Sequence, residues 1–299
     1  MNTSKKIIVI LGPTSSGKSS VAIKLAKKFN GEIISADSRQ IYRKMDLGTG
    51  KVTKSEQKMA RHWMLDIVSP KENYSVALFK REAEKIISDI FGRKKVPIIC
   101  GGTGFWIKSV VDDVNFPEVK PDWKLRERLG KLNARKLFSM LKEVDPERAK
   151  NIDSKNKVRI IRAIEICQKL GKVPQGIIFG FRATDYRFLQ IGMDVPRELL
   201  HDKIKKRLKK RFQAGLIEEV KTLRKNGLSW KKIQSFGLCY FWVPLYLEGK
   251  ISMYELEKRV YLAEKDYAKR QMTWFRKDKR IVWLKRYKEI EREVKKFLN

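Results

Sequence analysis

The sequence contains few of the residues that build disulfides, metal clusters and membrane spans. Its 299 residues include two histidines and three cysteines, which are Cys100, Cys167 and Cys239. Because the cysteines are single and widely spaced, we expect no disulfide framework, no cysteine-ligated metal and a reducing, cytoplasmic compartment. The first apolar run, residues 7–11, is too short for a signal peptide, and no stretch approaches the roughly 18 apolar residues of a membrane helix. We therefore expect a soluble protein without membrane association.

Acidic residues are also scarce. The chain has 34 Asp and Glu against 68 Lys and Arg, which gives a formal net charge of +34 at pH 7. This excess favours binding to a nucleic acid, because each Lys or Arg placed on a phosphate releases condensed counterions. A general lysine bias in the source organism is the alternative explanation. With 42% hydrophobic residues, the chain has a globular composition and is long enough to bury a core.

The first third of the chain alternates apolar strands with helices. Strands are predicted at residues 7–11, 32–35, 64–68 and 96–100, and an amphipathic helix at 75–91. Such alternation, with turns at the carboxyl ends of the strands, is typical of an α/β fold with a doubly wound, mostly parallel sheet.

The pattern becomes helical after residues 1–115, which we assign to the first part of this core. Residues 116–155 are charged and carry leucines at helical spacing, so they are predicted to form a helical insertion. Strand composition returns at residues 188–195. We assign residues 156–299 to the remainder of the core and a helical C-terminal region, with a last strand at 280–284.

The strongest motif follows the first strand and precedes the first helix. It is the G-x-x-x-x-G-K-[ST] pattern of Gly12, Pro13, Thr14, Ser15, Ser16, Gly17, Lys18 and Ser19. Its glycines let backbone N–H groups turn towards phosphate oxygens at a helix N-terminus, while Lys18 adds a charge and Ser19 a hydroxyl suited to Mg²⁺. A chance match in a turn is the alternative, and the flanking elements argue against it. The motif predicts a P-loop that binds a diphosphate or triphosphate, as in ATP-binding proteins.

A carboxylate that would complete an NTPase site is not evident. The strand at 96–100 ends in Gly101 and Gly102, and Asp66 is the one weak candidate for a Mg²⁺-binding acid. This lowers the expectation of a nucleic-acid-binding ATPase. A small-molecule P-loop kinase is the other alternative, and the high positive charge argues against it.

A second candidate group comprises Asp37, Ser38, Arg39 and Gln40, after the second predicted strand. In a doubly wound sheet this loop lies beside the P-loop. Asp37 could then accept a proton from an attacking nucleophile, and the Gln40 amide could pair with the edge of an adenine. Alternatively, Asp37 caps a helix or closes an Asx turn, and spacing alone favours this second role.

The ordered set of motifs resembles the bacterial tRNA dimethylallyltransferases. After the P-loop, the matching blocks are residues 37–42, 46–49, 62–67, 101–104, 162–165 and 268–275. The resemblance implies a prenyltransferase that takes dimethylallyl diphosphate, with Mg²⁺, and modifies the adenosine immediately 3′ of the anticodon of a tRNA. It further implies that this adenosine is flipped into a channel, where its exocyclic amine attacks the first carbon of the donor.

Family position assigns roles to individual residues. Asp37 is the expected general base; Thr14, Lys18 and Ser19 are expected to hold the diphosphate, and Arg207 to neutralise the leaving group. The expected contacts to the anticodon stem-loop are Asp37, Ser38, Arg39, Gln40, Thr103, Arg159, Arg162, Gln234 and Gly237, together with the insertion. For Thr103 a helix N-cap is the alternative role, and for the two helix arginines a solvated face. We expect the enzyme to be monomeric.

The sequence departs from the family pattern in two tRNA-contacting regions. Val158 stands where the family has glutamine, and Leu238 and Cys239 stand where it has tyrosine and a basic residue. Elsewhere, residues 203–211 are almost wholly cationic apart from an apolar stripe, which favours a phosphate-facing surface over a merely solvated one. The aromatic residues of the 268–275 block are expected to be core, with its basic residues facing RNA or the diphosphate.

Overall fold

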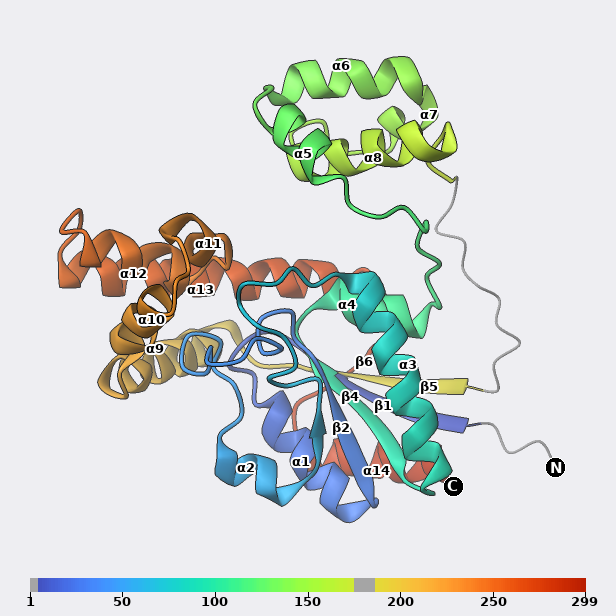
Figure 1. Ribbon diagram of the computed structural model, residues 1–299. Helices are drawn as coiled ribbons and strands as arrows, with labels where there is room; N and C mark the ends of the chain where they lie inside the picture. The colour runs from blue at the N-terminus through green and yellow to red at the C-terminus, as the bar shows by residue number, and fades with distance from the viewer. Residues whose placement is uncertain (1–4, 175–185) are drawn as a thin grey trace. The chain divides into compact units, whose positions relative to one another are not determined.

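The structure, a computed structural model, describes residues 5–174 and 186–299 (Figure 1). The chain divides into two compact units, which are described separately. The first comprises Met1–Val111 and Ala183–Asn299, and the second comprises Asp112–Arg182. Among the described residues, no helix combines the length and the apolar character needed to cross a bilayer.

The first unit is built on a six-stranded sheet whose neighbouring strands all run parallel. The strands are β1 (Lys5–Leu11), β2 (Gly31–Ala36), β3 (His62–Trp63), β4 (Val96–Gly101), β5 (Tyr186–Met193) and β6 (Val282–Leu284), in the order β3-β2-β4-β1-β5-β6. Gly101 is paired with Leu11 on one side and with Ala36 on the other. The carboxyl ends of β1, β2 and β4 therefore meet at one edge, and the predicted α/β class with a parallel sheet is confirmed.

Helices cover both faces of this sheet (Figure 1). On one face, α1 (Lys18–Lys28) and α14 (Tyr287–Leu298) pack against Ile8 and Ile10, and on the other α3 (Val76–Gly92) and α4 (Gly104–Val111) pack against Val9. Successive residues of a strand point to opposite faces, and β1 is buried on both. A continuous apolar run is thus the pattern expected of a central parallel strand.

The predicted strand at 64–68 is wrong. The observed β3 is shorter and earlier, because Met64 and Asp66 have φ angles of 63° and 56°. Such positive angles are incompatible with extended strand backbone. Beyond them, Val68 forms an isolated bridge with Tyr42.

The C-terminal part of the first unit is mostly helical. Its helices are α9 (Arg197–Gln213), α10 (Leu216–Lys225), α11 (Trp230–Ser235), α12 (Cys239–Leu247) and α13 (Met253–Phe275), while α2 (Lys54–Met59) lies in the N-terminal half. α13 is the longest and begins with a capping box between Ser252 and Glu255. The apolar stripe expected in α9 consists of Leu200, Ile204, Leu208 and Phe212, of which the first three are buried and Phe212 is partly buried. Arg211 is buried with them and so is not part of the cationic surface.

The second unit is a helical bundle. It contains α5 (Trp123–Gly130), α6 (Ala134–Val144), α7 (Pro146–Lys150) and α8 (Lys157–Leu170), around a core that includes Leu129, Leu141 and Ile160. The buried Glu165 carboxylate accepts hydrogen bonds from Arg126, Arg162 and the Asp122 backbone. The sequence placed the end of the insertion at residue 155, whereas α8 packs with α5 and α6 and belongs to the same unit.

Candidate functional site

The P-loop joins β1 directly to α1. Gly12, Ser15 and Gly17 have φ angles of 151°, 61° and 91°, and these turn the chain so that the helix starts at Lys18. Gly17 is the N-cap and supplies no side-chain hydrogen bond. The N–H groups of the first helical turn are consequently left for a ligand, and the helix dipole favours an anion there.

Buried polar atoms in this turn also fit an anion. The Oγ atoms of Ser15 and Ser16 are buried and have no hydrogen-bond partner in the described structure. The Nζ of Lys18 donates to the Pro13 carbonyl at 3.1 Å. Burial lowers the pKa of Lys18, and the negative charge of Asp37 acts in the opposite direction. Phosphate oxygens would satisfy both the unpaired hydroxyls and the partly desolvated ammonium.

A second cation, Arg207 from α9, reaches the P-loop. Its Nη1 lies 3.4 Å from Thr14 Oγ1, and its Nη2 donates to the Gly50 carbonyl at 2.5 Å. A Cβ on Gly50 would lie 1.9 Å from this Nη2, so only glycine allows the approach. Within residues 5–174 and 186–299, no carboxylate forms an ion pair with Arg207. Burial and the nearby Arg211 lower the pKa of Arg207.

Asp37 directly follows β2, and its carboxylate makes the Asx turn that was one of its two expected roles. Its Oδ1 accepts the backbone N–H groups of Arg39 at 2.9 Å and Gln40 at 3.4 Å, which is an Asx turn. The same carboxylate is within electrostatic reach of Lys18 and Arg207, since it raises the pKa of each. The structure therefore brings Asp37 to the P-loop, with Oδ1 engaged in the turn.

The neighbouring loops are linked to the Asp37 loop. The Thr103 hydroxyl accepts the Ser38 backbone N–H at 3.0 Å, while the Thr103 carbonyl, directly before α4, accepts the N–H groups of Trp106 and Ile107. Arg39 Nε donates to the Phe236 carbonyl at 2.7 Å, and its guanidinium lies 5.0 Å from the Tyr267 ring. The Gln40 amide donates to the Gly50 carbonyl at 3.3 Å, the same oxygen that binds Arg207.

Sequence reasoning missed the anchor of the 46–50 loop, Glu219. Its carboxylate accepts the N–H groups of Asp46, Leu47 and Gly48 at 2.7–2.9 Å, and the Tyr240 hydroxyl at 2.7 Å. A single glutamate on a helix carries no signal of such a role. The one related signal is the glycine-containing 46–49 block, whose backbone N–H groups need an acceptor.

A second buried group lies behind this loop. Arg211 donates to the Gly48 carbonyl at 2.7 Å and pairs with Glu264. The Cys239 thiol lies 3.4 Å from the same carbonyl, and burial raises its pKa to about 12. Cys239, one of the departures from the family pattern, therefore faces the protein interior. Its neighbour Leu238 adopts a φ of 49°, in the left-handed region.

The remaining residues of the predicted tRNA set lie at α11 and on α8. Gln234 and Gly237 are partly exposed on the segment that Arg39 contacts. In the second unit Arg159 is exposed, whereas Arg162 is held by Glu165 and the Val119 carbonyl. Val158 is 79% exposed. Arg162 is therefore partly exposed and already has two acceptors within the second unit.

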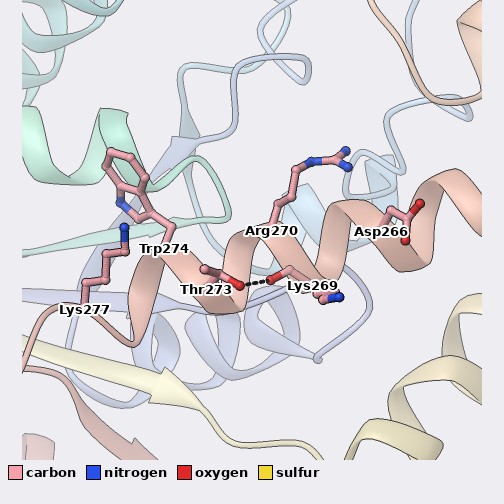
Figure 2. Close-up of a pocket in the computed structure, with 6 residues that line it drawn as sticks. All are labelled: Asp266, Lys269, Arg270, Thr273, Trp274 and Lys277. Atoms are coloured by element: carbon pink, nitrogen blue, oxygen red, sulfur yellow. Dashed lines mark hydrogen bonds between the residues drawn. The ribbon is translucent and has the colours of Figure 1, made fainter. Parts of the chain in front are cut away.

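A pocket lies against the C-terminal end of α13 (Figure 2). Its lining residues are Asp266, Lys269, Arg270, Thr273, Trp274 and Lys277. Trp274 is 39% exposed and packs edge-on against Phe105, with the ring centroids 6.3 Å apart. The expectation that the aromatic residues of this block are core holds for the buried Phe275 and is wrong for Trp274.

No preformed metal cage occurs in the part of the chain that the structure describes, since no three His, Cys, Asp or Glu side chains cluster suitably. Asp66, the weak candidate for a Mg²⁺ ligand, accepts a hydrogen bond from the buried Lys51 at 2.6 Å. The Ser19 hydroxyl, in the first turn of α1, is left as the P-loop group that could bind a metal. Such a metal would take most of its other ligands from phosphate oxygens and water, as Mg²⁺ commonly does.

Comparisons with known proteins agree with one another. The family model described as IPP transferase matches residues 40–278. The chain is 42% identical to a tRNA dimethylallyltransferase of Carboxydothermus hydrogenoformans, over 99% of this chain and 97% of that protein. The crystal structure of the full-length tRNA isopentenylpyrophosphate transferase of Bacillus halodurans superimposes with a TM-score of 0.73 at 32% identity, covering 98% of this chain and 97% of the other. A eukaryotic dimethylallyltransferase acting on tRNA gives 0.77 at 27% identity, covering 91% and 70%.

The anchoring role of Glu219 can be tested through stability. Glu219→Ala would leave three backbone N–H groups and a buried hydroxyl without their acceptor, so we expect a loss of about 2–4 kcal/mol in the free energy of unfolding. Thermal melting of the full chain measures it. Glu218→Ala is the matched control, because Glu218 is exposed and pairs with Lys221 on the same helix. Equal melting temperatures for the two variants would contradict the role.

Proposed function

The chain belongs to the IPP transferase family of tRNA-modifying prenyltransferases, and from this premise we propose its reaction. It transfers the dimethylallyl group of dimethylallyl diphosphate to the exocyclic amine of the adenosine immediately 3′ of the anticodon. The observation that carries the proposal is the pair of cations at the P-loop. Lys18 and Arg207 converge on a turn with unpaired hydroxyls, and among the described residues neither forms an ion pair with a carboxylate, although Asp37 is close enough to raise the pKa of both.

The two cations suit a diphosphate leaving group. Breaking the bond between the allylic carbon and oxygen leaves the electron pair on pyrophosphate, and preformed positive charge stabilises that developing charge. Arg207 is held in place by neutral acceptors, Thr14 Oγ1 and the Gly50 carbonyl. Its charge is thus available to the ligand.

Asp37 is suited to accept the proton. As the bond from the adenine nitrogen to the allylic carbon forms, the amine must lose a proton, and a positioned carboxylate can take it. Oδ1 is fixed by the Asx turn. The turn therefore orients the carboxylate and leaves Oδ2 as the proton acceptor, so the two roles of Asp37 are compatible.

The tRNA must present its base to this site. A stacked adenine is out of reach, so the nucleotide has to be extruded. We propose that Ser38, Arg39, Gln40 and Thr103 line its path, because their loops surround Asp37. Gln234, Gly237 and the exposed Arg159 would also contact the anticodon stem-loop. Residues Lys18, Asp37 and Arg207 come from one chain, which is consistent with a monomeric enzyme.

Mg²⁺ would bind at the P-loop together with the diphosphate donor. The Ser19 hydroxyl would hold it together with diphosphate oxygens, and it would supply further positive charge to the leaving group. An ATPase is not favoured, because the Asp66 carboxylate is engaged by Lys51 and β4 ends in glycines.

The reaction itself is tested by mass spectrometry. A tRNA incubated with the protein, dimethylallyl diphosphate and Mg²⁺ should gain the mass of one prenyl group on that adenosine, without ATP. A transcript carrying another base at this position is the control. Unmodified tRNA under these conditions would rule out the proposed reaction.

The role of Asp37 is tested by a matched pair of variants. Asp37→Asn keeps an acceptor for the turn and removes the base, whereas Asp37→Ala removes both. We expect each to lower the single-turnover rate about 10²–10⁴-fold. Pyrophosphate affinity, measured by calorimetry, should not weaken, because the lost charge is negative. An Asp37→Asn rate within about threefold of wild type would exclude Asp37 as the base.

The net charge of +34 predicts a steep salt dependence of tRNA binding. If about six phosphates are contacted, affinity should fall about 10³-fold between roughly 50 and 200 mM salt. Filter binding or fluorescence anisotropy gives the slope. A flat response would mean that the charge does not serve RNA binding.

A further inference from the structure

A buried ion pair, Arg211 with Glu264, lies behind the 46–50 loop. The two side chains come from α9 and α13 and are 7% and 2% exposed. Arg211 Nη1 donates a hydrogen bond to Glu264 Oε1. Arg211 Nε and Glu264 Oε2, however, are buried and have no hydrogen-bond partner in the part of the chain that the structure describes. A buried pair with unsatisfied atoms adds little to stability, which points to a function for it.

Arg211 and Arg207 bind the same loop. They lie four residues apart on α9 and therefore on one face of the helix. Arg207 Nη2 donates to the Gly50 carbonyl, and Arg211 Nη2 donates to the Gly48 carbonyl at 2.7 Å. The two guanidinium groups differ in one respect, because of these two arginines only Arg211 forms an ion pair among the described residues. One of two neighbouring positive charges is thus neutralised, and the other is left for a ligand.

Glu264 is a carboxylate that could instead neutralise Arg207. Burial and the charge of Arg211 lower the pKa of Arg207, whereas Glu264 raises it, so this carboxylate lies within electrostatic reach. A carboxylate buried away from water requires a cationic partner. Without Arg211, that partner would be Arg207, the next arginine on the same face of α9. Arg207 bound to Glu264 would then no longer be free to bind an anionic ligand.

The pairing also fits one departure from the family pattern. Cys239 stands where the family has a basic residue, and its Sγ lies 3.6 Å from Arg211 Nη2. A cation at position 239 would repel the arginine at this short distance. A neutral side chain next to Arg211 is therefore consistent with the α9 arginine being the cation that pairs with Glu264.

We propose that Arg211 is a positioning residue that keeps Arg207 free for the leaving group. It binds Glu264, which would otherwise pair with Arg207. It also holds the Gly48 carbonyl of the loop whose Gly50 carbonyl orients Arg207. The inference rests on the proposed function, in which Arg207 binds the diphosphate.

The test measures the Kd of pyrophosphate by calorimetry, with Mg²⁺, on the full chain. In Arg211→Met, Glu264 loses its partner and should pair with Arg207, so we expect affinity to fall about tenfold or more, as for the loss of a charge-assisted hydrogen bond. In the double variant Arg211→Met/Glu264→Gln the competing carboxylate is absent, and affinity should return to within about threefold of wild type. Lys258→Met removes a positive charge at an exposed position of α13 and is the matched control, which should bind as wild type does.

The outcomes separate the inference from its premise. If Arg211 only held the Gly48 carbonyl, Glu264→Gln would not rescue its loss, so equal affinities of the single and the double variant overturn the inference. Unchanged affinity in Arg211→Met overturns it as well. If Arg211→Met melts below the assay temperature, Glu264→Gln alone is measured: it should bind pyrophosphate at least as tightly as wild type, and a loss of more than about threefold overturns the inference. Wild-type affinity in Arg207→Ala would instead refute the proposed role of Arg207, on which the inference rests.

Discussion

The site depends on two cations, Lys18 and Arg207, held beside each other with neutral partners. Like charges in a partly desolvated turn repel, and burial lowers the pKa of both. The arrangement persists because the surrounding backbone is fixed. Gly50 offers its carbonyl to Arg207, and Glu219 holds the 46–50 loop by three N–H groups. A bound diphosphate would relieve the repulsion between Lys18 and Arg207. Without a ligand, this repulsion is offset by the contacts that fix the surrounding backbone.

The loops at the carboxyl ends of the parallel strands supply only part of this site. The P-loop follows β1, the Asp37 loop follows β2, and Thr103 follows β4, as expected for a doubly wound sheet. The other part comes from the C-terminal helices. α9 contributes Arg207, while α13 contributes Tyr267 and Gln271, whose Oε1 accepts the Thr14 backbone N–H. Helices that pack over the loops thus complete the site on a common type of phosphate-binding sheet.

The sequence could predict the site residues on the loops after the strands, and the family resemblance added Arg207, but two residues on the C-terminal helices were missed. The P-loop is a local motif whose flanking strand and helix can be read directly, and Asp37 was placed beside it by the topology of a parallel sheet. Gln271 and Glu219 could not be assigned, because they act on backbone groups 257 and 171–173 residues away. The third strand was misplaced for a different reason. Apolar residues predict a strand, but they do not reveal the left-handed backbone of Met64 and Asp66.

The positions of the carboxylates determine which positive charges they neutralise. Several act inside the protein: Glu32 binds Arg93 and Lys95, Glu165 binds Arg126 and Arg162, and Glu264 binds Arg211. Hydrogen bonds from Arg93 hold the pKa of Glu32 at about 2 against the cost of burial. These acids neutralise internal or half-buried bases, so they cannot offset the lysines and arginines that remain exposed. Lysine and arginine thus keep their two-to-one excess over acidic residues outside these internal pairs, and such an excess of positive charge is the property that RNA binding requires.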